Sequence, residues 1–202
     1  MQLRHQCETS LFVQRAENLK MKLSSLCVYC GSSTGKEPAF MEAGDRFGHI
    51  MAQSKVKLVY GGGGIGVMGA VARAVLAGGG QVTGIIPKFL TEVEVEFKEV
   101  TELIVTESMH ARKQLMFERS QGFVALPGGI GTVEETIEML TWAQLGRHSY
   151  PIVIANINGF WDPLIELLDH IIKAGFARSD IRRIYSVVDR VEDIIPRVEA
   201  SL

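Results

Sequence analysis

The sequence has few cysteines and no apolar run that is long enough to span a membrane. The cysteines are Cys7, Cys27 and Cys30, and an odd number without a disulfide-like framework is typical of a reducing compartment. Residues 1–20 lack the apolar core of a secretory signal. These absences predict a cytoplasmic protein with no membrane partner.

An excess of basic charge is also missing. The chain has 21 Lys and Arg residues against 23 Asp and Glu residues, which gives a net charge of −2 at pH 7. Nucleic-acid binding usually needs a concentrated basic surface, so we expect no nucleic-acid partner. Binding of a small anionic ligand is still compatible with this net charge, because a few local hydrogen-bond donors suffice for one phosphate. No His, Cys, Asp or Glu spacing is typical of a metal site, and we expect neither a metal nor another cofactor.

The length of 202 residues allows one full hydrophobic core. We therefore predict a single nucleotide-binding domain over residues 21–202. Residues 1–20 mix charged and apolar residues without a pattern, and we expect either a disordered extension or a stretch upstream of the true start.

Short apolar runs alternate with longer segments of helical periodicity. The predicted strands are residues 25–30, 56–60, 81–86, 103–106, 122–126, 152–155 and 184–188. The predicted helices are residues 38–53, a segment from the first glycine run to about 77, and residues 108–120, 132–145, 161–174 and 191–200. Nearly continuous apolar strands between helices indicate a mostly parallel sheet with helices on both faces. The prediction is a doubly wound, Rossmann-like α/β fold, in which ligands bind beyond the carboxyl ends of the strands.

The spacing Cys27-Val-Tyr-Cys30 matches the CxxC pattern of redox enzymes. It falls within a predicted strand, where residues i and i+3 point to opposite faces. Two buried strand cysteines are therefore the favoured interpretation.

Two glycine-rich turns follow predicted strands and open predicted helices. The first, Gly61-Gly-Gly-Gly-Ile-Gly-Val-Met-Gly69, matches GxGxxG twice, and the second is Pro127-Gly-Gly-Ile-Gly-Thr-Val-Glu-Glu135. Glycines let backbone N–H groups approach a phosphate at a helix N-terminus, although some serve only close packing. We predict substrate binding by Gly61, Gly62 and Gly63. A nicotinamide dehydrogenase is disfavoured, because the next strand ends Ile85-Ile86-Pro87-Lys88 without the acidic residue that holds a ribose.

Two charged positions allow a structural as well as a functional interpretation. Thr132-Val-Glu-Glu135 fits a capping box, in which Glu135 would only cap backbone N–H groups, and spacing alone favours capping. Arg112 and Lys113 stand early in a predicted helix, where cations oppose the helix dipole. They either meet an anion or form a solvated basic face.

At these motifs the sequence closely resembles the LONELY GUY (LOG) family of cytokinin riboside 5'-monophosphate phosphoribohydrolases. The matching segments are Cys30-Gly-Ser-Ser33, Val59-Tyr-Gly-Gly-Gly63, Met109-His-Ala-Arg-Lys113, the turn 127–135 and Thr141-Trp-Ala-Gln-Leu-Gly146. The resemblance implies hydrolysis of a purine nucleoside 5'-monophosphate, plain or N6-substituted, to free base and ribose 5-phosphate. It also implies a homodimer with the site near the subunit interface.

The resemblance assigns roles position by position. It implies Arg112 and Glu135 as the catalytic pair. The implied substrate contacts are Glu94, Lys113, Gly128, Gly129, Ile130, Gly131, Thr132, Val133, Glu134 and Thr141.

Two further functions compete with this expectation. A non-catalytic nucleotide or molybdenum-cofactor carrier could use a similar fold and similar glycine turns. The family also carries an older label, lysine decarboxylase. That label does not fit, because no lysine stands in the context that a pyridoxal phosphate enzyme needs for its Schiff base.

Overall fold

The computed structural model describes residues 22–91 and 97–202. The strands are β1 (Ser25–Tyr29), β2 (Lys57–Tyr60), β3 (Val82–Pro87), β4 (Glu102–Thr106), β5 (Phe123–Ala125), β6 (Ile152–Ala155) and β7 (Tyr185–Val188). They form one seven-stranded sheet in the order β4-β3-β2-β1-β5-β6-β7, and every pairing is parallel. The doubly wound α/β prediction is confirmed.

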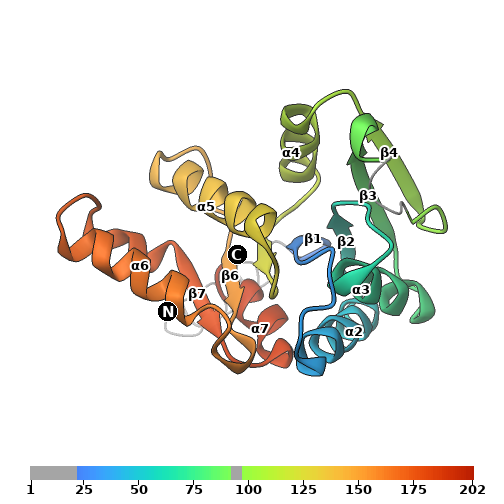
Figure 1. Cartoon of the computed structure of the whole chain (residues 1–202), viewed down its shortest axis with the longest axis horizontal. Helices are drawn as coiled ribbons and strands as arrows, with labels where there is room; N and C mark the ends of the chain where they lie inside the picture. Colours follow the sequence, from blue (N-terminus) through green and yellow to red (C-terminus); the bar gives the residue numbers. More distant parts are fainter. Residues whose placement is uncertain (1–21, 92–96) are drawn as a thin grey trace, which may run out of the picture.

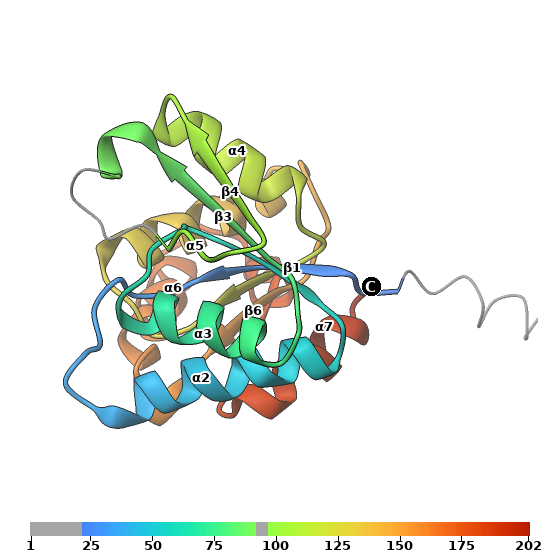
Figure 2. The same ribbon diagram turned by 90° about the vertical axis from the view of Figure 1, so that its right-hand side faces the viewer.

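Helices cover both faces of this sheet (Figures 1 and 2). One face carries α2 (Pro38–Gln53), α3 (Gly66–Ala77) and α7 (Ile194–Glu199), and the other carries α4 (Met109–Glu118), α5 (Ile130–Gln144) and α6 (Asp162–Lys173). Short 3-10 turns lie at Lys88–Leu90, Ile157–Gly159, Ser179–Arg183 and Val191–Asp193. Among the helices of the described ranges, none combines the length and apolar character that crossing a membrane requires.

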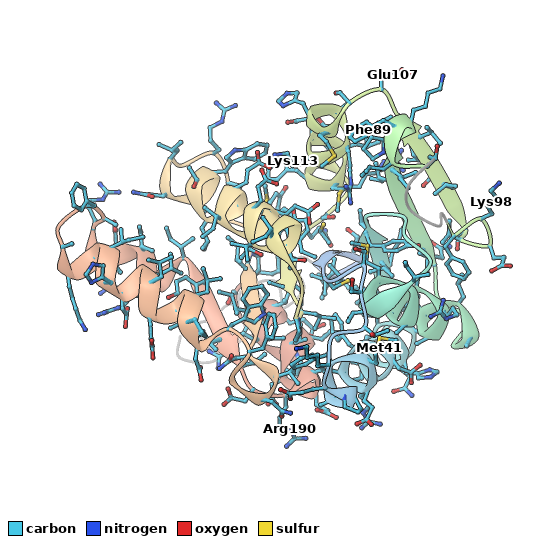
Figure 3. All side chains as sticks on the ribbon, in the orientation of Figure 1. Met41, Phe89, Lys98, Glu107, Lys113 and Arg190 are labelled. Carbon is cyan, nitrogen blue, oxygen red and sulfur yellow. The ribbon has the colours of Figure 1, made fainter. Side chains whose placement is uncertain are left out.

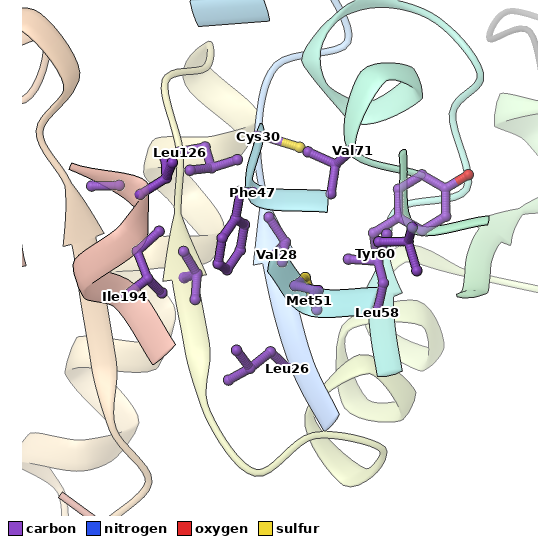
Figure 4. Close-up of a cluster of buried hydrophobic side chains, with 14 of the residues drawn as sticks. Leu26, Val28, Cys30, Phe47, Met51, Leu58, Tyr60, Val71, Leu126 and Ile194 are labelled. Atoms are coloured by element: carbon purple, nitrogen blue, oxygen red, sulfur yellow. The ribbon is translucent and has the colours of Figure 1, made fainter. Parts of the chain in front are cut away.

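Each face of the sheet has its own hydrophobic core. Strand β1 contributes Leu26 and Val28 to the core beneath α2, where they pack with Phe47 and Met51 (Figure 4). Cys30 belongs to this core, whereas Cys27 belongs to the core on the opposite face. Both thiols are free and buried, and burial raises the pKa of each. The interpretation of two buried strand cysteines is confirmed.

Two predicted helices have different starts in the structure. The helix predicted over 132–145 begins at Ile130, because Gly129 holds the extended N-cap position. The segment predicted as a helix over 191–200 is a 3-10 turn followed by α7. Pro196 lacks an N–H and is tolerated in the first turn of a helix, which is where the start at Ile194 places it.

Strand order reverses between β1, the central strand of the sheet, and its neighbour β5. Loops that leave two neighbouring strands in opposite directions open a crevice at the carboxyl edge, and ligands of this fold class bind there. The loops that follow β1 and β5 therefore frame the candidate site.

Candidate active site

The loops after β1 and β5 are joined directly. The backbone N–H of Gly31 donates to the carbonyl oxygen of Pro127 at 3.1 Å, and Met68 of α3 donates to the carbonyl oxygen of Gly31 at 3.1 Å. Gly66 has a φ of +61°, and a side chain there would overlap the backbone of Ser32 and Ser33. Part of the first glycine turn thus serves close packing, which brings the start of α3 to the loop after β1.

A cavity of about 270 Å³ lies between these loops, α4 and the start of α5. Its lining residues are Cys30, Gly31, Ser32, Met68, Met109, Arg112, Gly129, Ile130, Gly131, Thr132, Glu134 and Glu135. The structure therefore brings together the two residues predicted as catalytic and most of the predicted glycine loop.

Arg112 and Glu135 both line this cavity and face each other. Arg112 Nη2 lies 3.7 Å from Glu135 Oε1, and the two residues are only 5% and 6% exposed. Arg112 also donates to the carbonyl oxygen of Gly61 at 3.5 Å and contacts Met109 Sδ at 3.7 Å. Its buried Nε has no partner among the described residues. The Arg112 Nε–H group is therefore a buried donor without an acceptor. Such groups are rare in folded proteins, and a bound ligand could supply the acceptor.

Burial changes the acidity of Glu135. Desolvation raises the pKa of its carboxyl from an ordinary 4.5 to about 7, although the Arg112 charge lowers it. A carboxyl that titrates near neutral pH inside a cavity is a candidate for a functional group.

The capping interpretation of Glu135 is wrong. Because Gly129 is the N-cap of α5, Thr132 lies inside the first turn and Glu135 one turn further on. The Thr132 carbonyl accepts a hydrogen bond from the Thr136 hydroxyl at 2.6 Å, and the Glu135 carboxylate points to Arg112. The interpretation of Arg112 as part of a solvated face is wrong as well, because the residue is buried.

The start of α5 is open to the cavity. Apart from the adjoining backbone, no atom lies within 4 Å of the place where a side chain at Gly129 or Gly131 would stand. The first N–H groups of a helix have no intrahelical acceptor, and the helix dipole favours an anion there. Gly128 is different, since a side chain there would overlap Thr132 and lie 2.7 Å from the backbone nitrogen of Gly31.

Lys113 and Thr141 lie outside this cavity. Lys113 Nζ makes ion pairs with Glu134 at 2.7 Å and Glu138 at 3.0 Å. Thr141 is exposed on α5, and its hydroxyl donates to the Ile137 carbonyl at 2.8 Å. Thr141 and Val133 line a separate surface hollow of about 470 Å³. Their contact with a substrate stays a prediction.

The remaining predicted residues lie in different surroundings. Glu94 lies outside the described residues. Gly61 leaves room for the Arg112 guanidinium, which a side chain would overlap. Gly62 and Gly63 are buried and do not line the cavity.

Sequence reasoning gave no role to Ser32, Met68 or Met109, which line the cavity. All three stand in motifs that could have pointed to them: Ser32 in the turn after β1, Met109 in the segment that carries Arg112, and Met68 in the first glycine-rich turn.

A second cavity of about 440 Å³ adjoins the first and shares Gly31, Ser32 and Gly129 with it. Phe40, Phe160 and Val67 form its apolar wall. Groups that could ligate a metal, with three or more His, Cys, Asp or Glu side chains, do not occur in the described part of the chain.

Known proteins resemble this chain closely. A family model described as "Possible lysine decarboxylase" matches residues 68–198. The cytokinin riboside 5'-monophosphate phosphoribohydrolase LOG7 of Arabidopsis thaliana is 38% identical over 183 residues, which cover 91% of this chain and 84% of that protein. The cytokinin riboside 5'-monophosphate phosphoribohydrolase LOG of Oryza sativa subsp. japonica is 40% identical, with 91% of this chain and 78% of that protein covered.

The fold also matches solved structures. The molybdenum cofactor (Moco) carrier protein of Chlamydomonas reinhardtii superposes with a TM-score of 0.66 at 21% identity, covering 88% of this chain and 96% of that one. At this identity the likeness shows the fold alone. The sequence relatives are much closer and cover nearly all of the chain, and from them the chain belongs to the LONELY GUY (LOG) family of cytokinin riboside 5'-monophosphate phosphoribohydrolases.

Proposed function

We propose that this protein hydrolyses the N-glycosidic bond of adenosine 5'-monophosphate, plain or N6-substituted, and releases the free base and ribose 5-phosphate. One observation carries the proposal: a buried pair, Arg112 and Glu135, shares a cavity with the open N-terminus of α5. The names of the relatives in Arabidopsis and rice support the same reaction.

Glu135 is suited to the chemical step. Cleavage of the bond between C1' and the base passes through a sugar with oxocarbenium-like positive charge, and a fixed carboxylate at that point stabilises the charge. The bonding electrons leave with the base nitrogen, water oxygen bonds to C1', and one water proton passes to the Glu135 carboxylate and from there to the departing base, which regenerates the carboxylate. With a pKa of about 7, the Glu135 carboxylate can orient this water and accept its proton.

Arg112 and the start of α5 are suited to hold the substrate. The guanidinium faces the Glu135 carboxylate at 3.7 Å, where its charge favours the ionised carboxylate, and its Nε is available for a ribose or phosphate oxygen. The N–H groups of Ile130, Gly131 and Thr132 at the helix start bind the 5'-phosphate. A nucleoside without that phosphate should therefore react poorly.

The lysine decarboxylase description fits this site badly. Pyridoxal phosphate needs a free lysine for its Schiff base and a partner for the ring nitrogen. Lys113, the lysine next to Arg112, is held between Glu134 and Glu138, and it does not line the cavity.

The test is release of free base by the full-length protein. Purified protein is incubated with AMP, an N6-prenylated AMP and adenosine, and the bases are separated by chromatography. We expect base from the two nucleotides and little from adenosine. Binding of AMP without base release would favour the carrier function, and equal turnover of adenosine would refute the role of the phosphate.

The matched variants are Arg112→Ala and Glu135→Gln, which should fold and lose nearly all turnover. Glu166→Gln is the control, because Glu166 is an exposed carboxylate on α6. Full activity of Glu135→Gln would refute its catalytic role.

A cytoplasmic homodimer is part of the same proposal. Ile130 at the start of α5 and Leu145 at its C-cap are 86% and 70% exposed, and exposed apolar side chains of this size favour a partner surface. Thr141 lies on the same helix, so in a dimer it would be available to a substrate at the subunit interface.

A further inference from the structure

The cavity holds two methionines beside Arg112. Met109 is the first residue of α4, and its Sδ contacts Arg112 Nη1 at 3.7 Å. Met68 of α3 lines the same cavity. The sulfur of methionine is polarizable and is oxidised to the sulfoxide, which makes an apolar side chain polar. The proposed hydrolysis uses neither sulfur, so their place at the site points to a separate property.

A small oxidant can reach these two methionines. Met68 and Met109 are half-buried and line a cavity, and a cavity that admits a nucleotide also admits hydrogen peroxide. The methionines of the two cores are closed off, with exposures of 0% at Met51 and 1% at Met116 and Met139. Met41 is half-buried as well. Figure 3 shows it on α2, away from α4 and α5, which makes it a matched control.

The described cysteines do not compete for a mild oxidant. Cys27 and Cys30 are buried, and burial raises the pKa of each thiol. Peroxide reacts with the thiolate rather than with the thiol, so both are inert in the folded protein. Cys7 lies outside the described residues, and a Cys7→Ser background removes it from the experiment.

Oxidation of Met109 would change the surroundings of Arg112. A thioether sulfur is a weak hydrogen-bond acceptor, whereas the sulfoxide carries a polar oxygen. The contacts that now hold the guanidinium are long, at 3.5 Å to the Gly61 carbonyl oxygen and 3.7 Å to Glu135 Oε1. An oxygen bonded to the neighbouring Sδ therefore offers Arg112 a better acceptor than those it has. It also takes up room in a cavity of about 270 Å³.

We infer that Met109 is an oxidation site, and that its conversion to the sulfoxide draws Arg112 away from Glu135 and from the substrate and so stops turnover. Hydrogen peroxide is the oxidant. Sulfur donates an electron pair to one peroxide oxygen, the O–O bond breaks, and the second oxygen leaves with both protons as water. Sulfur is oxidised and peroxide is reduced. A methionine sulfoxide reductase, with a thiol as reductant, regenerates the thioether. The effect on turnover rests on the proposed function.

The experiment combines peroxide treatment of the Cys7→Ser protein with peptide mass spectrometry and base release from AMP. We expect kcat/KM to fall in step with sulfoxide at Met109 and to drop about tenfold or more at full oxidation, because a small displacement of Arg112 is costly to the chemical step. AMP present during the treatment should slow oxidation of Met109 but not of Met41. Reductase with dithiothreitol should restore activity.

Two leucine variants in the same background identify the sulfur. Leucine and methionine exchange with little loss of stability. Met109→Leu should retain its own untreated turnover after peroxide, whereas Met41→Leu should be as sensitive as its parent. If treated Met109→Leu loses as much activity as its parent does, the inference is overturned, whether Met68 or another group is responsible.

A readout without turnover separates this inference from the proposed function. If the untreated protein releases no base, the proposed function fails, and the Arg112 Nε–H group is followed by NMR instead. This group is buried, and Arg112→Lys identifies its signal by removing it. Peroxide should shift the signal in Met41→Leu and leave it in place in Met109→Leu. An unchanged signal in protein with Met109 fully oxidised would refute the link to Arg112.

Discussion

At the scale of single residues, Glu135 combines a cost in stability with a role in the site. Its carboxyl is nine-tenths buried or more and faces a guanidinium at 3.7 Å rather than at hydrogen-bond distance. An ordinary structural carboxylate would be paired more closely, because burying its charge is expensive. The same burial sets the pH range in which the residue can work.

The activity of the enzyme should fall below neutral pH. The ionised carboxylate stabilises the transition state, and the pKa of Glu135 is raised to about 7 by burial. We expect kcat to decrease about tenfold per pH unit below that value, measured as base release between pH 5 and 9. Constant activity down to pH 5 would show that this carboxyl titrates like an exposed glutamate.

Glu135→Gln should stabilise the fold at alkaline pH. The unfolded carboxyl titrates near 4.5 and the folded one at about 7. The stability contributed by this group is therefore fully present below pH 4.5 and is lost as pH rises through 7. Glutamine avoids that loss, and we expect a gain on the order of 2 kcal/mol at pH 8 that largely disappears by pH 5. Urea unfolding at the two pH values measures this, and a lower stability at pH 8 would indicate a structural role for Glu135.

At the scale of elements, the start of α5 contains a glycine required for close packing and, three residues later, a glycine that leaves space for a ligand. Gly128 is closely surrounded by Thr132 and Gly31, whereas Gly131 has open space beside it. Glycine in a helix is unfavourable relative to alanine, so packing does not explain Gly131. Free space for a ligand at the helix N-terminus does explain it.

Alanine substitutions at these two glycines should have opposite effects on stability. Gly131→Ala should leave the free energy of unfolding unchanged or raise it by up to about 1 kcal/mol, yet weaken binding of ribose 5-phosphate. Gly128→Ala should lower it by about 1–3 kcal/mol, because the new methyl group overlaps its neighbours. Chemical unfolding and titration calorimetry on both variants provide the measurement. Unchanged phosphate binding in Gly131→Ala would place the phosphate elsewhere.

At the scale of the whole molecule, the described chain presents apolar side chains outside both cores. Ile130 lines the hollow beside Thr141 on α5, and Leu145 is exposed at the C-cap of the same helix. Because this hollow borders the cavity at Ile130 and Glu134, a partner bound here would lie close to the site.

A charge on the outer side of α5 should separate the subunits. We expect sedimentation of the wild-type protein to show a dimer and Leu145→Glu to shift it toward monomer, because an unpaired charge at an interface is costly. Leu167→Glu on α6 is the matched comparison, since Leu167 is also an exposed leucine. Dissociation by Leu167→Glu alone would place the interface on α6.

Much of the fold could be predicted from local pattern. The helix over 38–53 and the strand over 152–155 have the predicted bounds, because the apolar spacing in these segments matches the side that they bury. The parallel sheet and the crevice at its carboxyl edge followed from the alternation of strands and helices.

Side-chain direction at the site was decided by the tertiary structure. The sequence by itself determined that Arg112, Lys113 and Glu135 follow strands at one edge of a parallel sheet. The sequence favoured a capping role for Glu135, because the Thr132–Glu135 spacing matches a capping box. That spacing does not reveal that the helix begins two residues earlier, at Ile130. Only the packing of α4 beside α5 decided that Arg112 meets Glu135 and that Lys113 turns to Glu134 and Glu138. Contacts between residues more than twenty positions apart depend on how two helices lie on a shared sheet, and local periodicity does not encode that distance.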